Sequence, residues 1–289
     1  MLTGSIWIEA SRPKTLSAAV APVLVGTAAA SAFSAWRFLA ALVVALAVQV
    51  GVNYANDYFD GVRGVDTEDR VGPRRTVASG LVSPTRMRSA MLVAFGVAAL
   101  AGLALSAVAG WWLVAVGLAC FLAALGYSGG SRPYASSGLG EAFVFVFFGL
   151  VATMGSAFVQ DERISPVVAV AAVPVGMLAV AILVANNLRD IETDANAGKR
   201  TLAVRLGDRG TRIFFVALVV GPFVFVPVVA VAAGSPWPLV ALLALVLAPV
   251  PARAAWGGAK GRTLIPVLAG AARLQISFGL LLAAGLLLA

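Results

Sequence analysis

Long apolar segments recur along this chain of 289 residues and constrain its fold more than any other feature. A helix needs about 20 apolar residues to cross a hydrocarbon core about 30 Å thick. Charged residues make up 12% of the chain, about half the share in a soluble domain. The sequence therefore predicts an all-α, polytopic membrane protein with about nine transmembrane helices, over 16–35, 38–56, 88–108, 111–128, 141–159, 165–187, 212–232, 237–255 and 271–289.

The composition also excludes several kinds of site. There is no histidine, which rules out histidine-zinc sites and Ser-His-Asp triads. The single cysteine, Cys120, cannot form an intramolecular disulfide. The net charge of +8 would suit a nucleic-acid-binding protein only if the basic residues lay on a soluble face. We expect a basic membrane surface instead, and no nucleic-acid partner.

The basic residues fall on one side of the predicted membrane. When alternate loops are compared, all 21 Lys and Arg residues except Arg37 and Arg163 lie on the side of the N-terminus. Cytoplasmic loops carry the excess of Lys and Arg in membrane proteins. We therefore expect a multi-pass protein of the cell (inner) membrane with a cytoplasmic N-terminus and, after nine helices, a C-terminus outside.

Two acidic clusters, 53–70 and 186–200, follow the second and sixth apolar segments on that side. Residues spaced i, i+4 share a helix face. The repeated Asn-x3-Asp phrase suggests a duplicated unit within a single domain spanning 1–289, with both copies facing a central cavity under the cytoplasmic loops. Each set is expected to line one face of its helix: Asn56 and Asp60 in the first, and Asn186, Asp190 and Asp194 in the second.

Carboxylate and amide oxygens in such sets suit Mg²⁺, which binds through one or two carboxylates together with substrate phosphates. Basic residues follow both clusters and are suited to phosphoryl oxygens. Mixed charges in a cytoplasmic loop are more often a solvated surface, and we prefer that interpretation for Glu68, Asp69 and Glu192. The duplicated phrase favours a magnesium diphosphate site for Asp60, Asp190 and Asp194.

The two motifs resemble those of the UbiA superfamily of intramembrane aromatic prenyltransferases, N-D-x-x-D-x-x-x-D and D-x-x-x-D. Asn56-Asp57-Tyr-Phe-Asp60 fits the first and Asp190-Ile-Glu-Thr-Asp194 the second. The chain departs from the first at Gly64, with Asp66 two residues later. This spacing resembles that of the branch of the superfamily that prenylates dihydroxynaphthoate on the way to menaquinone. The stretches 12–16, 127–141 and 198–207 also resemble that branch.

The resemblance implies transfer of a polyprenyl group from polyprenyl diphosphate to 1,4-dihydroxy-2-naphthoate. Diphosphate and CO₂ would be released and demethylmenaquinone formed. It implies two Mg²⁺ ions bridging the diphosphate and a lipid bilayer around the helices, and it says nothing of the oligomeric state. The alternatives are another aromatic acceptor, such as 4-hydroxybenzoate, or a polytopic transporter, which usually places ionisable residues near the bilayer midplane.

The same resemblance assigns expected roles to individual residues. The catalytic candidates are Asp60, Asp190 and Asp194. The metal-ligand candidates are Asn56, Asp57, Asp60, Asp66, Asp190 and Asp194. The diphosphate candidates are Arg63, Arg70, Lys199 and Arg200, and the acceptor candidates are Arg12, Lys14, Tyr127, Arg132 and Tyr134. For the small residues Gly26, Gly51, Gly96, Gly102, Gly149 and Gly155, we expect close helix packing more than room for the prenyl tail.

Overall fold

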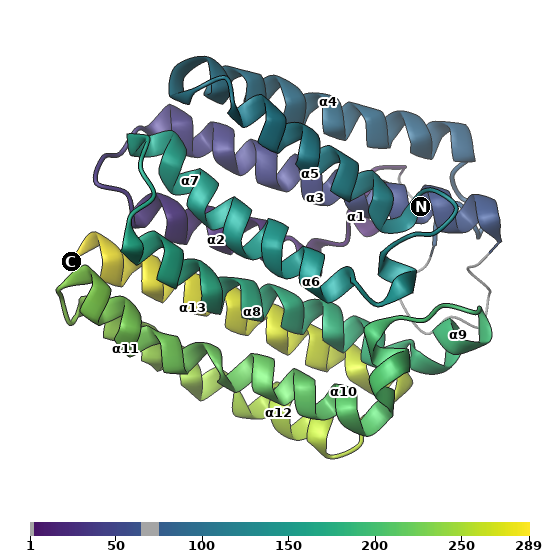
Figure 1. The fold of residues 1–289 in the computed structure, drawn as a ribbon. Coiled ribbons are helices and arrows are strands. Elements are labelled where there is room, and N and C mark those ends of the chain that lie inside the picture. The colour runs from purple at the N-terminus through teal and green to yellow at the C-terminus, as the bar shows by residue number, and fades with distance from the viewer. Residues whose placement is uncertain (1–2, 65–74) are drawn as a thin grey trace.

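The computed structural model of this chain describes residues 3–64 and 75–289, and within them every regular element is a helix. The all-α prediction is therefore confirmed. The helices lie side by side in layers, with α4 and α5 on one flank and α10, α11 and α12 on the other (Figure 1). The N- and C-termini lie toward opposite ends of the bundle.

Seven helical stretches in the described part of the chain are long and apolar enough to cross a membrane, which confirms the multi-pass architecture. They are α3 (Ala35–Arg63), α4 (Pro84–Ala109), α6–η3–α7 (Gly140–Val144, Phe145–Val151, Ala152–Asp161), α8 (Pro166–Arg189), α10–α11 (Leu202–Val220, Pro222–Ala233), η4–α12 (Trp237–Leu247, Pro249–Trp256) and η5–α13 (Gly261–Leu264, Ile265–Leu287). Two shorter apolar helices, α2 (Ser17–Ala28) and α5 (Leu113–Ser128), occupy the other two predicted segments. The number nine itself stays a prediction.

The remaining elements are short and either precede α2 or connect the longer helices. They are α1 (Thr3–Ser11), η1 (Pro13–Thr15), η2 (Ala135–Ser137) and α9 (Ile191–Asn196). Helix α9 lies at the end of the bundle opposite the C-terminus (Figure 1).

Two predicted helix starts are wrong by several residues. The seventh segment begins at Leu202, with a non-helical residue at Gly207 (φ 68°, ψ 177°), rather than at 212, and the ninth helix begins at Ile265 rather than 271. Arg212, the first residue of the predicted seventh segment, lies inside α10 after this break. In the structure this side chain is buried within α10, where its Nε donates to Asp208 Oδ2 (2.6 Å) and its Nη2 to the Ala259 carbonyl (2.9 Å). Paired in this way, a charged residue can sit inside a helix that otherwise continues into the membrane.

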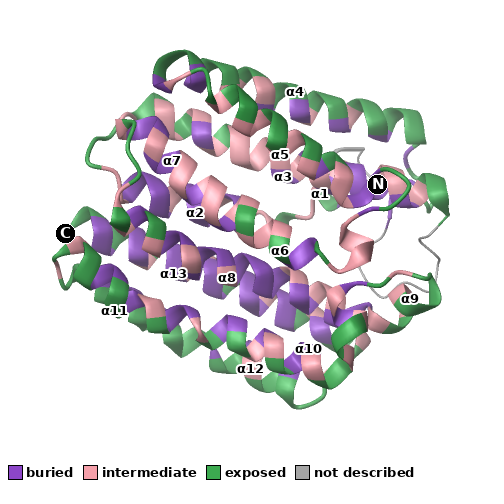
Figure 2. Ribbon diagram, viewed as in Figure 1, coloured by how far each residue is buried: buried purple, intermediate pink, exposed green. Residues whose placement is uncertain are grey.

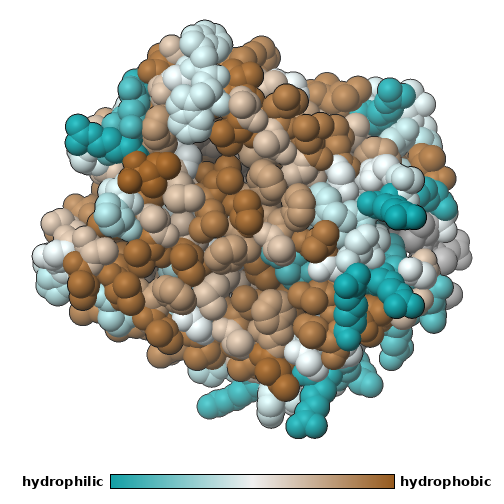
Figure 3. Space-filling model, in the orientation of Figure 1, coloured by the Kyte–Doolittle hydropathy of each residue, from teal (hydrophilic) through white to brown (hydrophobic). Residues whose placement is uncertain are grey.

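The core of the bundle is formed around α8, which packs against α2, α10, α11 and α13. Helices α8 and α13 are the most deeply buried of the long helices (Figure 2). Large apolar side chains on the outer helices are exposed, for example Leu100 (72%), Val231 (82%) and Val246 (76%). Apolar residues cover the middle of the molecule, while many hydrophilic ones gather at the end near α9 (Figure 3). Such exposure is expected where lipid surrounds the helices.

Arg37, one of the two exceptions to the charge asymmetry, is paired at the end of the bundle away from the acidic clusters. Arg37 donates from Nη1 to the Val159 carbonyl (2.9 Å) and forms an ion pair with Glu162 at 3.9 Å. Nearby, Asp161 accepts hydrogen bonds from the backbone N–H and the hydroxyl of Ser31, both at 2.7 Å. These charged residues link the loop after α2 to the loop after α7, away from the acidic clusters.

Candidate active site

Helix α3 continues through the first motif, so Asn56 and Asp60 lie one turn apart near its end, as predicted. Both side chains line a small pocket of about 70 Å³. The helix ends because Gly64 adopts φ 65°, a left-handed conformation that glycine takes at little cost. The residue that departs from the superfamily motif is thus the C-cap of α3.

The second motif is built differently from its prediction. Helix α8 ends at Arg189, Asp190 has a non-helical backbone (φ −101°, ψ 9°), and α9 begins at Ile191. The expectation that Asn186, Asp190 and Asp194 share one face of one helix is therefore wrong. The turn nevertheless brings all three into the same pocket as Asn56 and Asp60. We call this the polar pocket; its lining also includes Arg12, Arg75, Tyr127, Ser128, Asn187 and Lys199.

A lysine joins the aspartates of the two motifs. Lys199 Nζ lies 3.7 Å from Asp60 Oδ2 and 3.6 Å from Asp194 Oδ1. Asp60 Oδ2 also lies 3.5 Å from Arg75 Nη2. The acids of α3 and α9 thus converge on a single position that already accommodates a positive charge.

Asn56 and Asp190 are held by neighbours that sequence reasoning missed. The Ser128 hydroxyl, at the end of α5, donates to Asn56 Oδ1. Arg189 forms a two-point contact with Asp190, from Nε to Oδ1 and from Nη2 to Oδ2, both at 2.7 Å. Ser128 lies within the stretch 127–141 that carries the family resemblance, and Arg189 directly precedes the second motif. Their positions in the sequence could therefore have identified both as neighbours of the site.

Asp57 faces away from this cluster. Its carboxylate accepts hydrogen bonds from the Thr76 N–H (3.0 Å), the Thr76 hydroxyl (2.8 Å) and the Val77 N–H (3.1 Å). These bonds fasten the chain after residue 75 to α3, beside Arg75, which reaches into the polar pocket. The geometry thus gives Asp57 a role in positioning a loop and argues against the predicted role as a metal ligand.

Two loops close over the polar pocket and are bonded to each other. The Arg200 N–H donates to the Ser136 carbonyl (2.8 Å), and Arg205 Nη2 donates to the Ser137 carbonyl (2.8 Å). Ser136 and Thr201, one from each loop, line the pocket. The loop between α5 and α6 and the loop after α9 therefore form a joint cover, as the prediction of capping loops requires.

A second, much larger cavity adjoins the polar pocket. Its volume is about 830 Å³, and mainly apolar residues of α2, α3, α4, α5, η3, α7 and α8 line it. Five residues, Arg12, Asn56, Arg75, Tyr127 and Asn186, line both spaces. We call the larger space the apolar cavity. It extends from the polar pocket deep into the bundle, as far as Ser106 and Leu113.

The glycines divide into two groups at this cavity. Close packing holds for Gly26, Gly51 and Gly149, where an added Cβ would lie 2.1 to 2.6 Å from a neighbouring helix. Gly102 and Gly155 line the apolar cavity, and a Cβ there would meet nothing within 4 Å. The packing prediction is therefore wrong at these two positions, where the missing side chain leaves room, and at Gly96 on the exposed face of α4, where a Cβ would also meet nothing within 4 Å.

The acceptor candidates are only partly brought together. Arg12 and Tyr127 line both spaces, and Lys14 and Tyr134 line the apolar cavity. Tyr127 and Tyr134 meet edge to face, with ring centroids 5.5 Å apart. Burial, together with the nearby Tyr127, raises the pKa of Tyr134, whose hydroxyl donates to the Ala123 carbonyl (2.7 Å). Arg132 is exposed and lines neither space.

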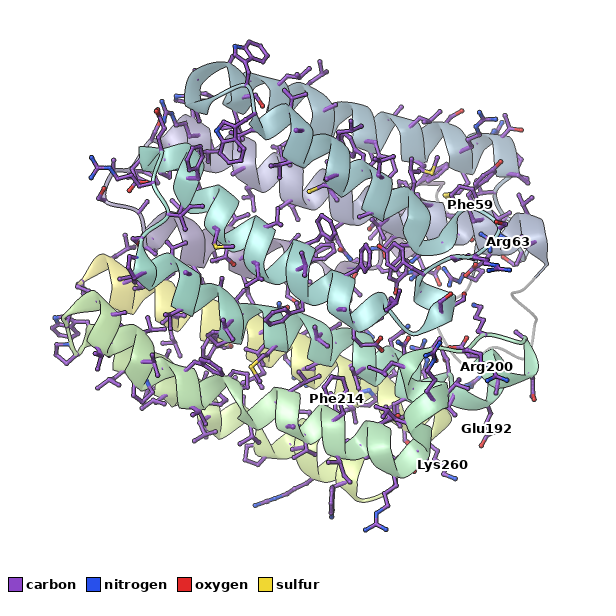
Figure 4. All side chains as sticks on the ribbon, viewed as in Figure 1. Phe59, Arg63, Glu192, Arg200, Phe214 and Lys260 are labelled. Carbon is purple, nitrogen blue, oxygen red and sulfur yellow. The ribbon has the colours of Figure 1, made fainter. Side chains whose placement is uncertain are left out.

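Among the diphosphate candidates that the structure describes, only Lys199 lies in the polar pocket. Arg63 is exposed and its guanidinium sits over the Phe59 ring, 5.8 Å from the centroid. Arg200 is also exposed, at the same end of the bundle (Figure 4). Arg70 and the metal candidate Asp66 lie outside the described residues.

The donor set fits a hard cation that shares its coordination with a ligand. Within residues 3–64 and 75–289, no three acidic side chains are grouped closely enough to hold a metal ion by themselves. Asp60 and Asp194 do approach one position, which Lys199 Nζ occupies. Mg²⁺ characteristically takes one or two carboxylates and completes its coordination with phosphate and water.

The sequence pattern of the UbiA prenyltransferase family matches residues 19–264. A 1,4-dihydroxy-2-naphthoate octaprenyltransferase of Mycobacterium tuberculosis is 48% identical over 267 residues, which cover 91% of this chain and 90% of that protein. The enzyme with the same name in Escherichia coli is 40% identical, over 75% of this chain and 74% of its own.

Solved structures share the fold. A UbiA homologue from Aeropyrum pernix matches with a TM-score of 0.69 and 15% identity, over 95% of this chain and 97% of its own. A UbiA homologue from Archaeoglobus fulgidus, bound to GPP and Mg²⁺, matches with a TM-score of 0.67 and 15% identity, over 96% and 99%. At this identity the likeness concerns the fold.

Proposed function

Since this chain belongs to the UbiA prenyltransferase family, we propose that it transfers a polyprenyl group from polyprenyl diphosphate to 1,4-dihydroxy-2-naphthoate. The allylic C–O bond breaks, and diphosphate leaves. A new C–C bond forms at the carboxylated ring carbon, and CO₂ departs while its bonding electrons stay in the ring. The product is demethylmenaquinone in its quinol form.

The observation that carries this proposal is the junction of the two spaces. An acid- and base-lined pocket opens into a deep apolar cavity, and Asn56, Arg75 and Tyr127 stand at their shared wall. A polyprenyl diphosphate has the same division into a charged head and a long apolar tail. The functional name of the relatives at 48% and 40% identity supports the choice of naphthoate as acceptor.

We assign the polar pocket to the diphosphate and its metal. Asn56, Asp60, Asp190 and Asp194 would hold Mg²⁺, directly or through water, and we propose two ions. When bound, Mg²⁺ would neutralise negative charge that develops on the departing diphosphate. Lys199 and Arg75, which contact Asp60, are placed to donate to phosphoryl oxygens.

The chain itself must exclude water from the allylic cation. The two hydrogen-bonded loops that contain Ser136 and Thr201 border the polar pocket, and apolar residues surround most of the adjoining cavity. The rings of Tyr127 and Tyr134 lie at the wall of the apolar cavity, where aromatic faces stabilise positive charge. With no histidine in the chain, proton transfer from the acceptor would fall to a carboxylate, a tyrosine or the departing diphosphate.

We further propose that the polar pocket opens on the cytoplasmic side of the cell (inner) membrane, with the N-terminus cytoplasmic and the C-terminus outside. The lysine and arginine distribution supports this orientation. A cysteine placed at exposed Arg209 in sealed, right-side-out vesicles, on a Cys120→Ser background, should resist a membrane-impermeant thiol reagent. A cysteine at exposed Arg163 should react. The opposite pattern would reverse the orientation.

Purified protein with polyprenyl diphosphate and 1,4-dihydroxy-2-naphthoate tests the function. We expect prenylated quinol and CO₂ in equal amounts with Mg²⁺, and neither after the metal is chelated. Parallel reactions with 4-hydroxybenzoate test the alternative acceptor. If no Mg²⁺-dependent product forms with any aromatic acceptor, the enzyme assignment is refuted. Solute uptake by proteoliposomes would then favour a transporter.

A further inference from the structure

Arg189 is held in one orientation at the wall of the apolar cavity. Its Nε and Nη2 donate to the two oxygens of Asp190, and Nη2 also donates to Asn186 Oδ1, all at 2.7 Å. The side chain is only 3% exposed. A guanidinium fixed by three charge-assisted or polar hydrogen bonds loses little further entropy when it binds a ligand.

One nitrogen of this guanidinium remains available. Nη1 has no hydrogen-bond partner in the part of the chain that the structure describes, although Nε and Nη2 are both engaged. Arg189 lines the apolar cavity and is absent from the lining of the polar pocket. The planar fork of arginine directs its donors along fixed lines. With one edge held by Asp190 and Nη2 also bonded to Asn186, Nη1 is the nitrogen left for a ligand in the cavity that Arg189 lines.

From this geometry, and resting on the function proposed above, we infer that Arg189 recognises the carboxylate of the aromatic acceptor. The diphosphate has its own cations in the polar pocket, Lys199 and Arg75. A second anion that enters with an apolar ring would meet Arg189 on the apolar side. Arginine suits a planar carboxylate because its donors match the carboxylate geometry.

The Asp190 carboxylate offsets the positive charge of Arg189, which limits the net electrostatic attraction that the arginine can add to acceptor binding. We expect it to supply directed hydrogen bonds, and hence discrimination between acceptors, more than net attraction. Arg12 and Arg75, which line both spaces, supply positive charge nearby. Arg189 is thereby a specificity residue for carboxylated acceptors.

The test compares two ligands that differ only in the carboxylate. Equilibrium binding of 1,4-dihydroxy-2-naphthoate and of 1,4-dihydroxynaphthalene is measured, under reducing conditions and without prenyl diphosphate, for wild type, Arg189→Gln and Arg189→Lys. For Arg189→Gln we expect the naphthoate Kd to rise about tenfold or more, as for the loss of a charged hydrogen bond. The naphthalenediol Kd should change less than about threefold. Arg189→Lys, which keeps the charge but not the fork, should fall between.

Arg209→Gln serves as the matched control, because Arg209 is an exposed arginine of α10 outside both spaces. Thermal unfolding in detergent identifies any variant that has lost its fold, and Arg189→Lys then carries the test. Equal changes in both affinities, or no selectivity in wild type, would overturn the inference. Wild-type turnover is measured in parallel: its absence counts against the proposed function, whereas turnover with unchanged selectivity in Arg189→Gln counts against Arg189 alone.

Discussion

The polar pocket and the apolar cavity differ in almost every physical respect, although they share a wall. The pocket measures about 70 Å³ and is lined mainly by polar and charged residues; the cavity measures about 830 Å³ and is lined mainly by apolar ones. Charged residues are expensive within a membrane unless they are paired or reach its interface. The chain meets this limit by gathering its aspartates at the ends of α3 and α8.

The difference shows how recognition is divided between the two spaces. Binding in the pocket would depend on a few side-chain atoms at fixed distances, such as the carboxylate oxygens of Asp60 and Asp194 and the Nζ of Lys199. The cavity depends on volume and on the absence of side chains at positions such as Gly155. Single-atom changes should therefore be costly in the pocket, whereas only changes of bulk should matter in the cavity.

The largest effect is expected from Asp60→Asn and Asp194→Asn. Each would remove the negative charge of a proposed oxygen ligand, and stabilisation of the leaving group is worth several kcal/mol, with about 1.4 kcal/mol for each factor of ten in rate. Initial rates at saturating Mg²⁺ should fall at least about 100-fold. Glu192→Gln, an exposed acid on the same short helix as Asp194, should keep the wild-type rate. Near wild-type rates for both aspartate variants would remove the metal assignment.

A smaller, selective effect is expected in the apolar cavity from Gly155→Leu. The leucine would fill space about 22 Å along the helical stretch that begins at Gly140, far from the polar pocket. We expect kcat/KM to fall about tenfold for a long polyprenyl diphosphate and to stay unchanged for geranyl diphosphate. Gly96→Leu is the control, since Gly96 has equal room but lies exposed on α4 outside the cavity. Equal losses for short and long substrates would contradict the division between head and tail.

The smallest effect is expected from Asp57→Ala, although Asp57 directly follows Asn56. Its three accepted hydrogen bonds hold Thr76 and Val77, so their loss should destabilise the fold by about 1–3 kcal/mol and displace Arg75. We expect a lower midpoint of thermal unfolding and a rate reduced about fivefold. A rate loss as large as that of Asp60→Asn would place Asp57 with the metal ligands and extend the polar pocket.

The sequence was informative where one physical pattern dominates. Long apolar runs predicted the spans, and i, i+4 spacing placed Asn56 and Asp60 correctly because α3 continues through the motif. The same spacing gave a wrong prediction around Asp190, because α8 ends at Arg189 and a separate helix, α9, begins at Ile191. A helical spacing pattern cannot reveal a local break in the helix.

Partners far apart in sequence could not be predicted from spacing. Lys199 was assigned to phosphate, but its position between Asp60 and Asp194 depends on how two loops fold. Arg75 enters the pocket because Asp57 anchors the residues that follow it. Arg63 and Arg200, equally basic in the sequence, remain exposed. Proximity to a motif identified the correct region and left the direction of each side chain open.

The most direct test is a structure of the full chain with Mn²⁺ in place of Mg²⁺ and a non-hydrolysable thiolo analogue of a polyprenyl diphosphate. We expect anomalous signal from Mn²⁺ between Asp60 and Asp194, with the diphosphate beside Lys199. The tail should follow the apolar cavity past Gly102 and Gly155. Metal bound away from these aspartates, or a tail lying on the outer, lipid-facing surface, would contradict the division into a head pocket and a tail cavity.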